Sequence, residues 1–360
     1  MRYYYRGKSP LILAILLLLL AVWSVGTPMA AAAQVIPTST EGQAPGPLSD
    51  YTYPEYDAEP PIFTVVSETE TTLVVRDAWG EVTIPKNPQR IFVLDELALD
   101  ILLSIGIKPV GVVGDPEGKV SRYFEGRMEG VPVLPGWEPN FEAILELEPD
   151  LIVSIFGWTN DYREGLSKIA PTLISYPGAF PFWRQTTLDL SNILGRAEQG
   201  QQLLADYDTA VAAALDDLPP GLRDGSEGLA VLSAQLDSLR IYGVGFQRDD
   251  QFYPTNVTQV PYADLRLTPP EMVRDVSQLD VGGGYREISL EVLPEIESEH
   301  LLLYVIDPEK GTELENSPLF QSMPAVQQGN VYRLPSDSLA FGPVNMMKRL
   351  EEFLQVVNAN

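Results

Sequence analysis

The sequence predicts an α/β protein of two Rossmann-like lobes that are joined by a single long α-helix. Three observations lead to this prediction. Segments with strand character alternate with segments of helical periodicity, one helix-then-strand motif occurs in both halves, and one helical stripe between the halves is much longer than the others. Alternating strands and helices are typical of parallel βαβ units, because a parallel crossover is usually made by a helix.

The repeated motif is clearest in residues 140–154, NFEAILELEPDLIVS. Phe141, Ile144 and Leu145 share one face of a predicted helix. Pro149 ends this helix, because proline cannot donate a hydrogen bond there and biases Glu148 toward extended backbone. The apolar Leu-Ile-Val run that follows predicts a strand that is buried on both faces.

Residues 289–304, SLEVLPEIESEHLLLY, repeat this motif without a gap, so that Glu142 aligns with Glu291 and Ile152 with Leu301. Either copy alone could be any acidic amphipathic helix before a strand, but two copies in register indicate two lobes of similar build. Both glutamates fall in a first helical turn, where the helix dipole favours a carboxylate. We expect both to be exposed, on opposite lobes and on the same rim.

The long helix is predicted over residues 196–218, which carry an apolar stripe through Leu204, Tyr207 and Val211. At 1.5 Å per residue it would extend about 34 Å, enough to link two lobes. The predicted boundaries are therefore an N-terminal lobe over 63–195, the linking helix over 196–218, and a C-terminal lobe over 219–360.

The other helices are predicted from helical periodicity, and the other strands from short apolar or β-prone runs. Glycines end the first and last helix of the N-terminal lobe. Residues 243–284 show no clear periodicity. The expected strands of the body are 72–76, 82–84, 90–94, 109–113, 131–134, 172–175, 229–234, 239–242, 301–305 and 330–334, and the expected helices are 96–105, 162–170, 182–194, 318–326 and 343–357.

The N-terminus has the pattern of an export signal. Three basic residues precede an apolar run over 11–25, and small residues follow at 31–33. We expect residues 1–33 to be a signal peptide that is cleaved after Ala33; a retained membrane anchor is the alternative. Residues 34–62, rich in Pro, Ser, Thr, Gly and acids, are expected to form a disordered tether. The body would then be periplasmic or otherwise extracytoplasmic.

The composition excludes several classes of protein. The 360 residues carry a net charge of −26, so the surface would repel nucleic acid and anionic lipid. The chain has no cysteine, which excludes disulfides, thiolate metal sites and lipid attachment through cysteine.

Ligands of open α/β sheets bind outside the carboxyl ends of the strands, so a ligand cleft is expected between the lobes. The loops at these ends are 95–96, 135–140, 156–160, 176–184, 242–246, 282–286 and 337–342. Their aromatic and arginine side chains offer stacking area and planar, charged donors, although loop tryptophans can also pack on the lobe surface. The candidate ligand-binding residues are Trp137, Trp158, Trp183, Arg184, Tyr242, Tyr285 and Arg286.

Four segments of the chain resemble the substrate-binding proteins of ABC transporters for iron siderophores, haem and cobalamin. They read NPQRIFVLDELALDILLSIGIKPVGV, PNFEAILELEPDLIV, ISLEVLPEIESEHLLLYV and PLFQSMPAVQQGNVYRL, and the resemblance is poor in 243–284. It implies that Glu142 and Glu291 dock on arginines of the permease dimer, with no direct part in ligand binding. The ferric-siderophore branch is the most similar, with haem or cobalamin as alternatives. The resemblance therefore implies a monomer that captures a ferric siderophore, with no cofactor, because ferric iron would be carried only within the bound chelate.

Other classes of site are weakly supported. His300 is the only histidine, which disfavours a zinc-type or manganese-type site and histidine-held haem, while tyrosine ligation of haem stays open. We expect His300 to be structural, at the start of a buried strand. Histidine-dependent and cysteine-dependent catalysis is nearly excluded, and no catalytic residue is expected. A secreted hydrolase with a carboxylate pair is the remaining alternative of a different class.

Overall fold

The computed structural model describes residues 55–136, 138–155, 161–175, 182–235, 238–248, 251–255, 257–279, 283–335 and 341–359. The expected signal peptide and most of the expected tether lie outside these residues. The structure nevertheless differs from the predicted tether at its end. Residues 55–62, which were predicted to belong to the tether, form hydrogen bonds with the body through Tyr56 and Glu59. The body of the protein therefore begins before residue 63.

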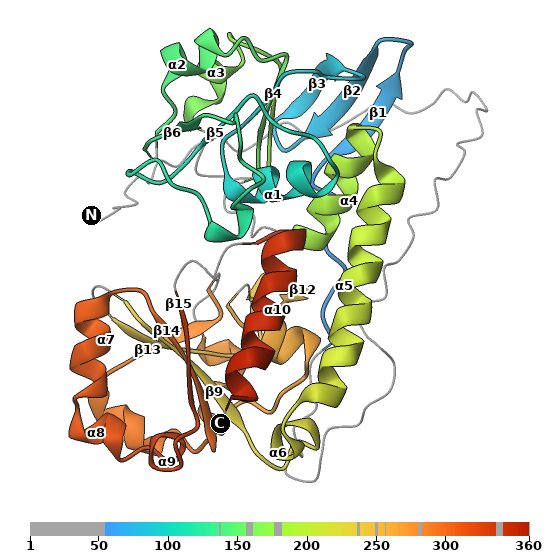
Figure 1. The fold of residues 1–360 in the computed structure, drawn as a ribbon. Coiled ribbons are helices and arrows are strands. Elements are labelled where there is room, and N and C mark those ends of the chain that lie inside the picture. The colour runs from blue at the N-terminus through green and yellow to red at the C-terminus, as the bar shows by residue number, and fades with distance from the viewer. Residues whose placement is uncertain are drawn as a thin grey trace, which may run out of the picture. The chain divides into compact units, whose positions relative to one another are not determined.

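The N-terminal lobe holds a parallel sheet of five strands in the order β6-β5-β4-β7-β8 (Figure 1). Its elements are β4 (Ile91–Val93), α1 (Glu96–Ser104), β5 (Gly111–Val113), β6 (Val133–Leu134), α2 (Phe141–Glu146), β7 (Leu151–Ser154), α3 (Arg163–Leu166), β8 (Thr172–Ile174) and α4 (Trp183–Ile193). A separate antiparallel sheet precedes them, formed by β1 (Thr64–Glu68), β2 (Thr72–Asp77) and β3 (Gly80–Pro85). Strands β4, β5, β7 and β8 are buried on both faces, as their continuous apolar runs predict, whereas the edge strand β6 is half-buried.

The long helix α5 (Ala197–Asp217) follows the N-terminal lobe and has 21 residues. Figure 1 shows it running from beside α4 to the start of the second lobe. Leu204, Tyr207 and Val211 form its buried stripe, as the periodicity predicts.

The C-terminal lobe has its own five-stranded sheet, in the order β13-β10-β9-β14-β15. Its sheet strands are β9 (Leu229–Ala234), β10 (Leu239–Tyr242), β13 (Tyr285–Ile288), β14 (His300–Val305) and β15 (Val331–Pro335). Its α-helices are α6 (Pro220–Arg223), α7 (Pro308–Glu315), α8 (Pro318–Gln321), α9 (Pro324–Gln327) and α10 (Pro343–Val357). Because the two large sheets are separate, the predicted fold of two α/β lobes joined by one long helix is confirmed.

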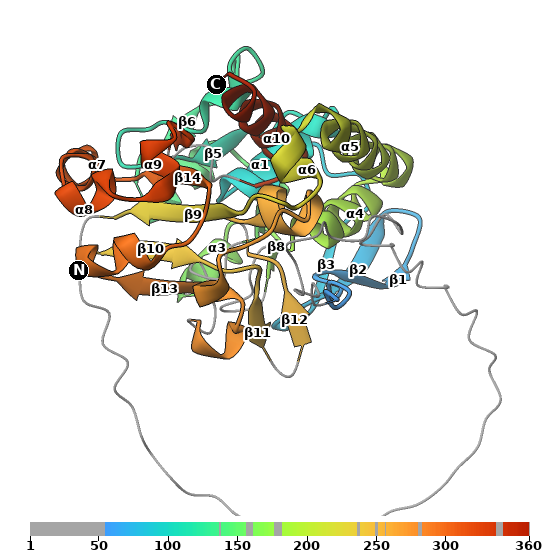
Figure 2. The ribbon, with the colours of Figure 1, turned by 90° about the horizontal axis from the view of Figure 1, so that it is seen from below.

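Three details of the C-terminal lobe differ from the prediction. Strand β10 runs antiparallel to both of its neighbours, because a short hairpin connects it to β9. The helix expected over 318–326 is two short helices, and the second one begins at Pro324, whose ring cannot continue a preceding helix. The region over 243–284 is built from the hairpin β11 (Phe246–Arg248) and β12 (Gln251–Tyr253), a π-helix η3 (Gln259–Asp264) and short 3₁₀ turns; Figure 2 shows the hairpin projecting beyond the sheet.

The two copies of the repeated motif have matching bounds. The helix α2 corresponds to η6 (Leu290–Glu295), and both β7 and β14 begin five residues after their helix ends. Ile144 and Leu293 occupy the same position and are both fully buried. The second copy is a 3₁₀-helix with Pro294 inside it, because proline lacks the N–H that an α-helix requires there.

Two local expectations about the first copy are wrong. Only Ile144 of the predicted apolar face is buried, whereas Phe141 is 37% and Leu145 58% exposed. Glu148 has a left-handed φ of +44° instead of an extended backbone. Its carbonyl oxygen accepts a hydrogen bond from Nε of Arg90 at 2.8 Å, and Nη2 of Arg90 donates to the carbonyl oxygen of Leu147 at 2.5 Å. The Arg90 guanidinium thereby satisfies the carbonyls at the helix end, which compensates the unusual backbone.

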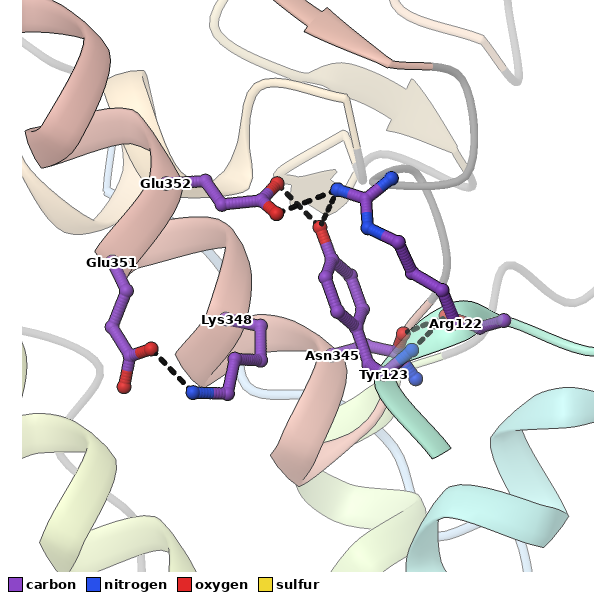
Figure 3. A network of polar contacts seen from close by, with 7 residues as sticks. Arg122, Tyr123, Asn345, Lys348, Glu351 and Glu352 are labelled. Carbon is purple, nitrogen blue, oxygen red and sulfur yellow. Dashed lines mark hydrogen bonds and ion pairs between the residues drawn. The ribbon is translucent and has the colours of Figure 1, made fainter. Parts of the chain in front are cut away.

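The closing helix α10 belongs to the C-terminal part of the chain but is bonded to the N-terminal lobe. Figure 3 shows Glu352 pointing toward Arg122 and Tyr123, with Nη2 of Arg122 at 2.6 Å from Oε1 of Glu352. Near the beginning of α10, the side chain of Asn345 accepts a hydrogen bond from the hydroxyl of Ser121 at 3.0 Å. The carboxylate of Asp100 in α1 accepts the backbone N–H groups of Val344 and Asn345, both at 2.9 Å. Asp100 thus caps a helix that lies more than two hundred residues away in sequence.

Candidate binding loops and docking glutamates

The order of the N-terminal sheet reverses between β4 and β7, and ligands of open α/β sheets bind beyond such a point. Asp95 lies there and is 5% exposed. Its carboxylate accepts the N–H of Ala98 at 2.9 Å, which caps α1, and the N–H of Ile155 at 2.6 Å. Asp95 therefore ties the ends of the two strands together. Beside it, burial raises the pKa of Glu96 to about 7, although the backbone N–H of Ser121 donates to this carboxylate at 2.8 Å.

Two of the predicted ligand-binding residues, Trp137 and Trp158, lie outside the described residues. Their contact with a ligand stays a prediction.

Trp183 and Arg184 begin α4 and are buried, with exposed fractions of 2% and 8%. Nη2 of Arg184 lies 2.7 Å from Asp208 and 4.0 Å from Asp264. Burial raises the pKa of Asp264 above its ordinary value, even though the Arg184 guanidinium opposes the shift. The rings of Trp183 and Tyr207 form a T-shaped pair, with 5.1 Å between centroids. The structure thus places this aromatic–arginine pair where α4, α5 and η3 meet, and its contact with a ligand stays a prediction.

The C-terminal candidates Tyr242, Tyr285 and Arg286 lie on two paired strands, so the prediction that Tyr285 and Arg286 belong to a loop is wrong: they begin the edge strand β13. Tyr242 is opposite Tyr285 in the β10–β13 ladder, and the ring centroids are 5.7 Å apart. The Tyr242 hydroxyl is 3.1 Å from that of Ser233, whereas Arg286 is exposed. The structure therefore brings the two tyrosines together and leaves Arg286 facing solvent.

A further charged residue, Arg240, contacts Tyr285 and was not among the candidates. The guanidinium carbon of Arg240 lies over the Tyr285 ring at 4.3 Å from its centroid, and Nη2 is 3.4 Å from Glu287. Arg240 lies inside a strand, and only the antiparallel pairing of β10 with β13 brings it to Tyr285. The apolar–polar–apolar order of Leu239, Arg240 and Ile241 was the available signal, because it indicates a strand with one outward face.

Both glutamates of the repeated motif are exposed, in the first turn of α2 and of η6. The helix of Glu142 is capped by Asn140, whose side chain accepts the N–H of Ala143 at 3.1 Å. A hydrogen bond from the side chain of Ser289 holds the pKa of Glu291 below its usual value. Both carboxylates are therefore available to a cationic partner.

His300 is buried at the start of β14, as its position in the motif predicts. Its Nδ1 lies 2.7 Å from the Tyr332 hydroxyl, and its Nε2 lies 2.8 Å from Glu227. Within the described part of the chain, no three histidine or acidic side chains are grouped so that they could hold a metal ion. Among the helices described, none is both long enough and apolar enough to cross a membrane.

Comparison with known proteins agrees with this architecture. Residues 91–239 match the family model described as periplasmic binding protein. The chain is 25% identical over 278 residues to the Fe(3+)-citrate-binding protein YfmC of Bacillus subtilis, covering 76% of this chain and 81% of the relative. It is 28% identical over 282 residues to the probable siderophore-binding lipoprotein YfiY of the same organism, covering 75% and 82%.

The fold is shared with solved structures. A FhuD-fold binding protein component of a Fep/Fec-like ferrichrome ABC transporter from Bacillus subtilis superposes with a TM-score of 0.66 at 24% identity, over 78% of this chain and 98% of that one. The chain is therefore similar in sequence to binding proteins for ferric citrate and siderophores, and similar in fold to a solved transporter binding protein, which confirms the resemblance predicted from its sequence.

Proposed function

We propose that this chain is an extracytoplasmic binding protein that captures a ferric siderophore and delivers it to the permease dimer of an ABC transporter. The observation that carries the proposal is the repeated motif. It presents one exposed glutamate at the same position before corresponding strands of two sheets. In a chain whose relatives are named as binding proteins for ferric citrate and siderophores, this pair fits docking on cationic permease loops.

The protein would act as a monomer outside the cytoplasm, exported by residues 1–33, and would not be an enzyme. Iron would enter and leave within its chelate, with no cofactor bound to the protein. The buried pairing of His300 with Glu227 and Tyr332 supports this, because that imidazole is already engaged on both nitrogens. Haem and cobalamin are the alternative ligands.

A titration of tryptophan fluorescence tests capture. The purified mature protein is titrated with ferric citrate, a ferric hydroxamate, a ferric catecholate, haem, cobalamin and free ferric ion. We expect saturable binding of one class of ferric chelate, with the chelate recovered chemically unchanged. Tight binding of free ferric ion with no affinity for any chelate would contradict the proposal, and chemical conversion of the chelate would favour the hydrolase alternative.

Docking is tested by the double substitution Glu142→Ala with Glu291→Ala. Arginine–carboxylate pairs that are desolvated at an interface cost about 2–5 kcal/mol when one partner is removed. We therefore expect unchanged chelate affinity and loss of uptake in cells. The matched control is Glu146→Ala with Glu295→Ala, which removes the same charge from exposed, aligned positions of the same two helices. Equal loss of uptake in both double variants would mean that total charge, and not position, matters.

The candidate loops are tested in the same titration. Trp158→Ala and Arg286→Ala should each weaken chelate binding if these residues line the cleft, and normal affinity in both would redirect the search to Arg240 and Tyr285.

A further inference from the structure

The C-terminal lobe carries a hollow of about 200 Å³ where the ends of β9 and β13 meet α7. Figure 1 shows α7 beside this sheet. Its apolar lining consists of Ala234, Leu239, Ile288, Leu290 and Leu314, which belong to the core of the lobe or pack against it. Lys310 and Glu313 of α7 also line it, and their side chains are 47% and 61% exposed. The hollow is therefore an apolar depression with charged groups at its solvent side.

This hollow adjoins Glu291. Ser289 and Leu290 line it and immediately precede that glutamate in η6. The same Ser289 side chain hydrogen-bonds the Glu291 carboxylate. A cation that pairs with Glu291 therefore arrives at the edge of the hollow.

The buried hydroxyl of Ser238 also lines the hollow and has no hydrogen-bond partner among the described residues. The volume suits a large apolar side chain, because a dry cavity of about 150 Å³ can hold benzene.

The aligned positions of the other lobe carry exposed apolar side chains. Phe141 and Leu145 align with Leu290 and Pro294, and these two apolar side chains of α2 are 37% and 58% exposed. The first copy of the motif thus exposes apolar side chains beside Glu142, whereas the second copy has a hollow beside Glu291.

We propose that the hollow receives an apolar side chain of the permease, from the same segment whose arginine pairs with Glu291. Charge complementarity favours such a segment, because Glu291 adjoins the hollow on a chain with a net charge of −26, whereas Glu313 is already paired with Lys310 at 2.7 Å. This inference rests on the proposed function and deepens it, because it assigns docking an apolar contact in addition to the ion pair. It also means that the two lobes meet the permease through different surfaces.

The substitution Ser238→Phe tests the inference by filling the hollow while leaving Glu291 unchanged. The gene for the variant replaces the wild-type gene in the organism that produces the protein. Uptake is then measured with the radiolabelled ferric chelate that the purified wild-type protein binds most tightly. We expect chelate affinity within about twofold of wild type and uptake reduced at least tenfold. The matched control is Ser277→Phe, which places the same side chain at an exposed position outside the hollow and should leave uptake unchanged.

Leu290→Lys is the second variant if Ser238→Phe does not fold. It places a cation in the hollow that repels the incoming arginine, and it should reduce uptake to the same extent. Normal uptake in a folded variant of either kind would overturn the inference while leaving the proposed function intact. Weakened chelate binding by Ser238→Phe would also overturn it, because the chelate itself would then occupy the hollow. If the wild-type protein binds no chelate, the proposed function has failed instead.

Discussion

The buried carboxylate of Asp100 is expected to make the stability of the protein depend on pH. Its side chain is fully buried and accepts four hydrogen bonds, from the N–H groups of Val344 and Asn345, the Asn345 side chain at 2.7 Å and the Ser104 hydroxyl at 3.0 Å. Burial nevertheless raises its pKa from 3.8 to about 6, because desolvation outweighs these bonds. The folded protein therefore holds a proton on Asp100 between about pH 4 and pH 6, whereas the unfolded chain does not.

The sign and size follow from linkage. Because the folded state binds more protons in this window, the contribution of Asp100 to stability is full below pH 4 and declines as pH rises toward 6. At about 1.4 kcal/mol for each pH unit, the decline is about 3 kcal/mol. Asp100→Asn removes the titration. It also replaces one accepting oxygen by a donor, so two of the four hydrogen bonds are lost, at about 1–3 kcal/mol for each unsatisfied group.

Urea unfolding of wild type and Asp100→Asn at pH 4, 5, 6 and 7 measures this effect. The variant should be less stable at pH 4, and the gap should narrow by about 3 kcal/mol by pH 7, because only the wild type loses the contribution. All other titrating groups are shared and cancel in the difference. Asp216→Asn, the same change at an exposed position of α5, is the control. A gap between wild type and Asp100→Asn that is constant across the range would refute the reasoning.

Three further outcomes are expected. Gly342→Ala should lower the melting temperature sharply, because Gly342 has a φ of +112° and an added Cβ would lie 2.6 Å from Asp100; an unchanged melting temperature would contradict this. His300→Phe should cost about 1–3 kcal/mol in urea unfolding, because Glu227 and Tyr332 lose their partner, while the fluorescence titration should show normal chelate affinity. Leu145→Asn should change the unfolding free energy by less than about 0.5 kcal/mol, because the side chain is 58% exposed, and a larger loss would show that Leu145 belongs to the core.

The elements that were predictable from the sequence are those whose signal is local. The bounds of β9, β10 and α10 agree with the apolar runs and the periodic stripe that predict them. The repeated motif was predictable for the same reason, because its helix, its turn and its strand follow one another within fifteen residues. Even there, the sequence did not show that Leu145 faces solvent, since a six-residue helix turns only one of its apolar positions fully into the core.

The candidate ligand residues depend on contacts between distant segments. Arg184 follows Trp183 at the start of a helix, as a residue of a binding loop would, but its partners Asp208 and Asp264 come from α5 and η3. The sequence pattern within 176–184 cannot predict that these two carboxylates lie beside Arg184. Tyr242 ends β10, as predicted, but Tyr285 begins β13, a strand that was not predicted. Their mutual contact depends on the antiparallel pairing of β10 with β13, which the expectation of parallel βαβ units did not include.

The proposed docking residues were easier to predict than the candidate ligand residues, and this difference has a physical basis. A docking carboxylate needs only exposure and a fixed direction, and both come from its own helix turn, such as the one that Asn140 caps before Glu142. A ligand-binding side chain must converge with others from several strands, so its identity depends on the tertiary arrangement. The hollow beside Glu291 depends both on a local sequence motif and on contacts between distant segments. Its glutamate was visible in the repeated motif, whereas Lys310 and Glu313 reach it from α7, an element with no counterpart in the sequence prediction. The proposed docking surface could therefore be located from the repeat, but its shape must come from the structure.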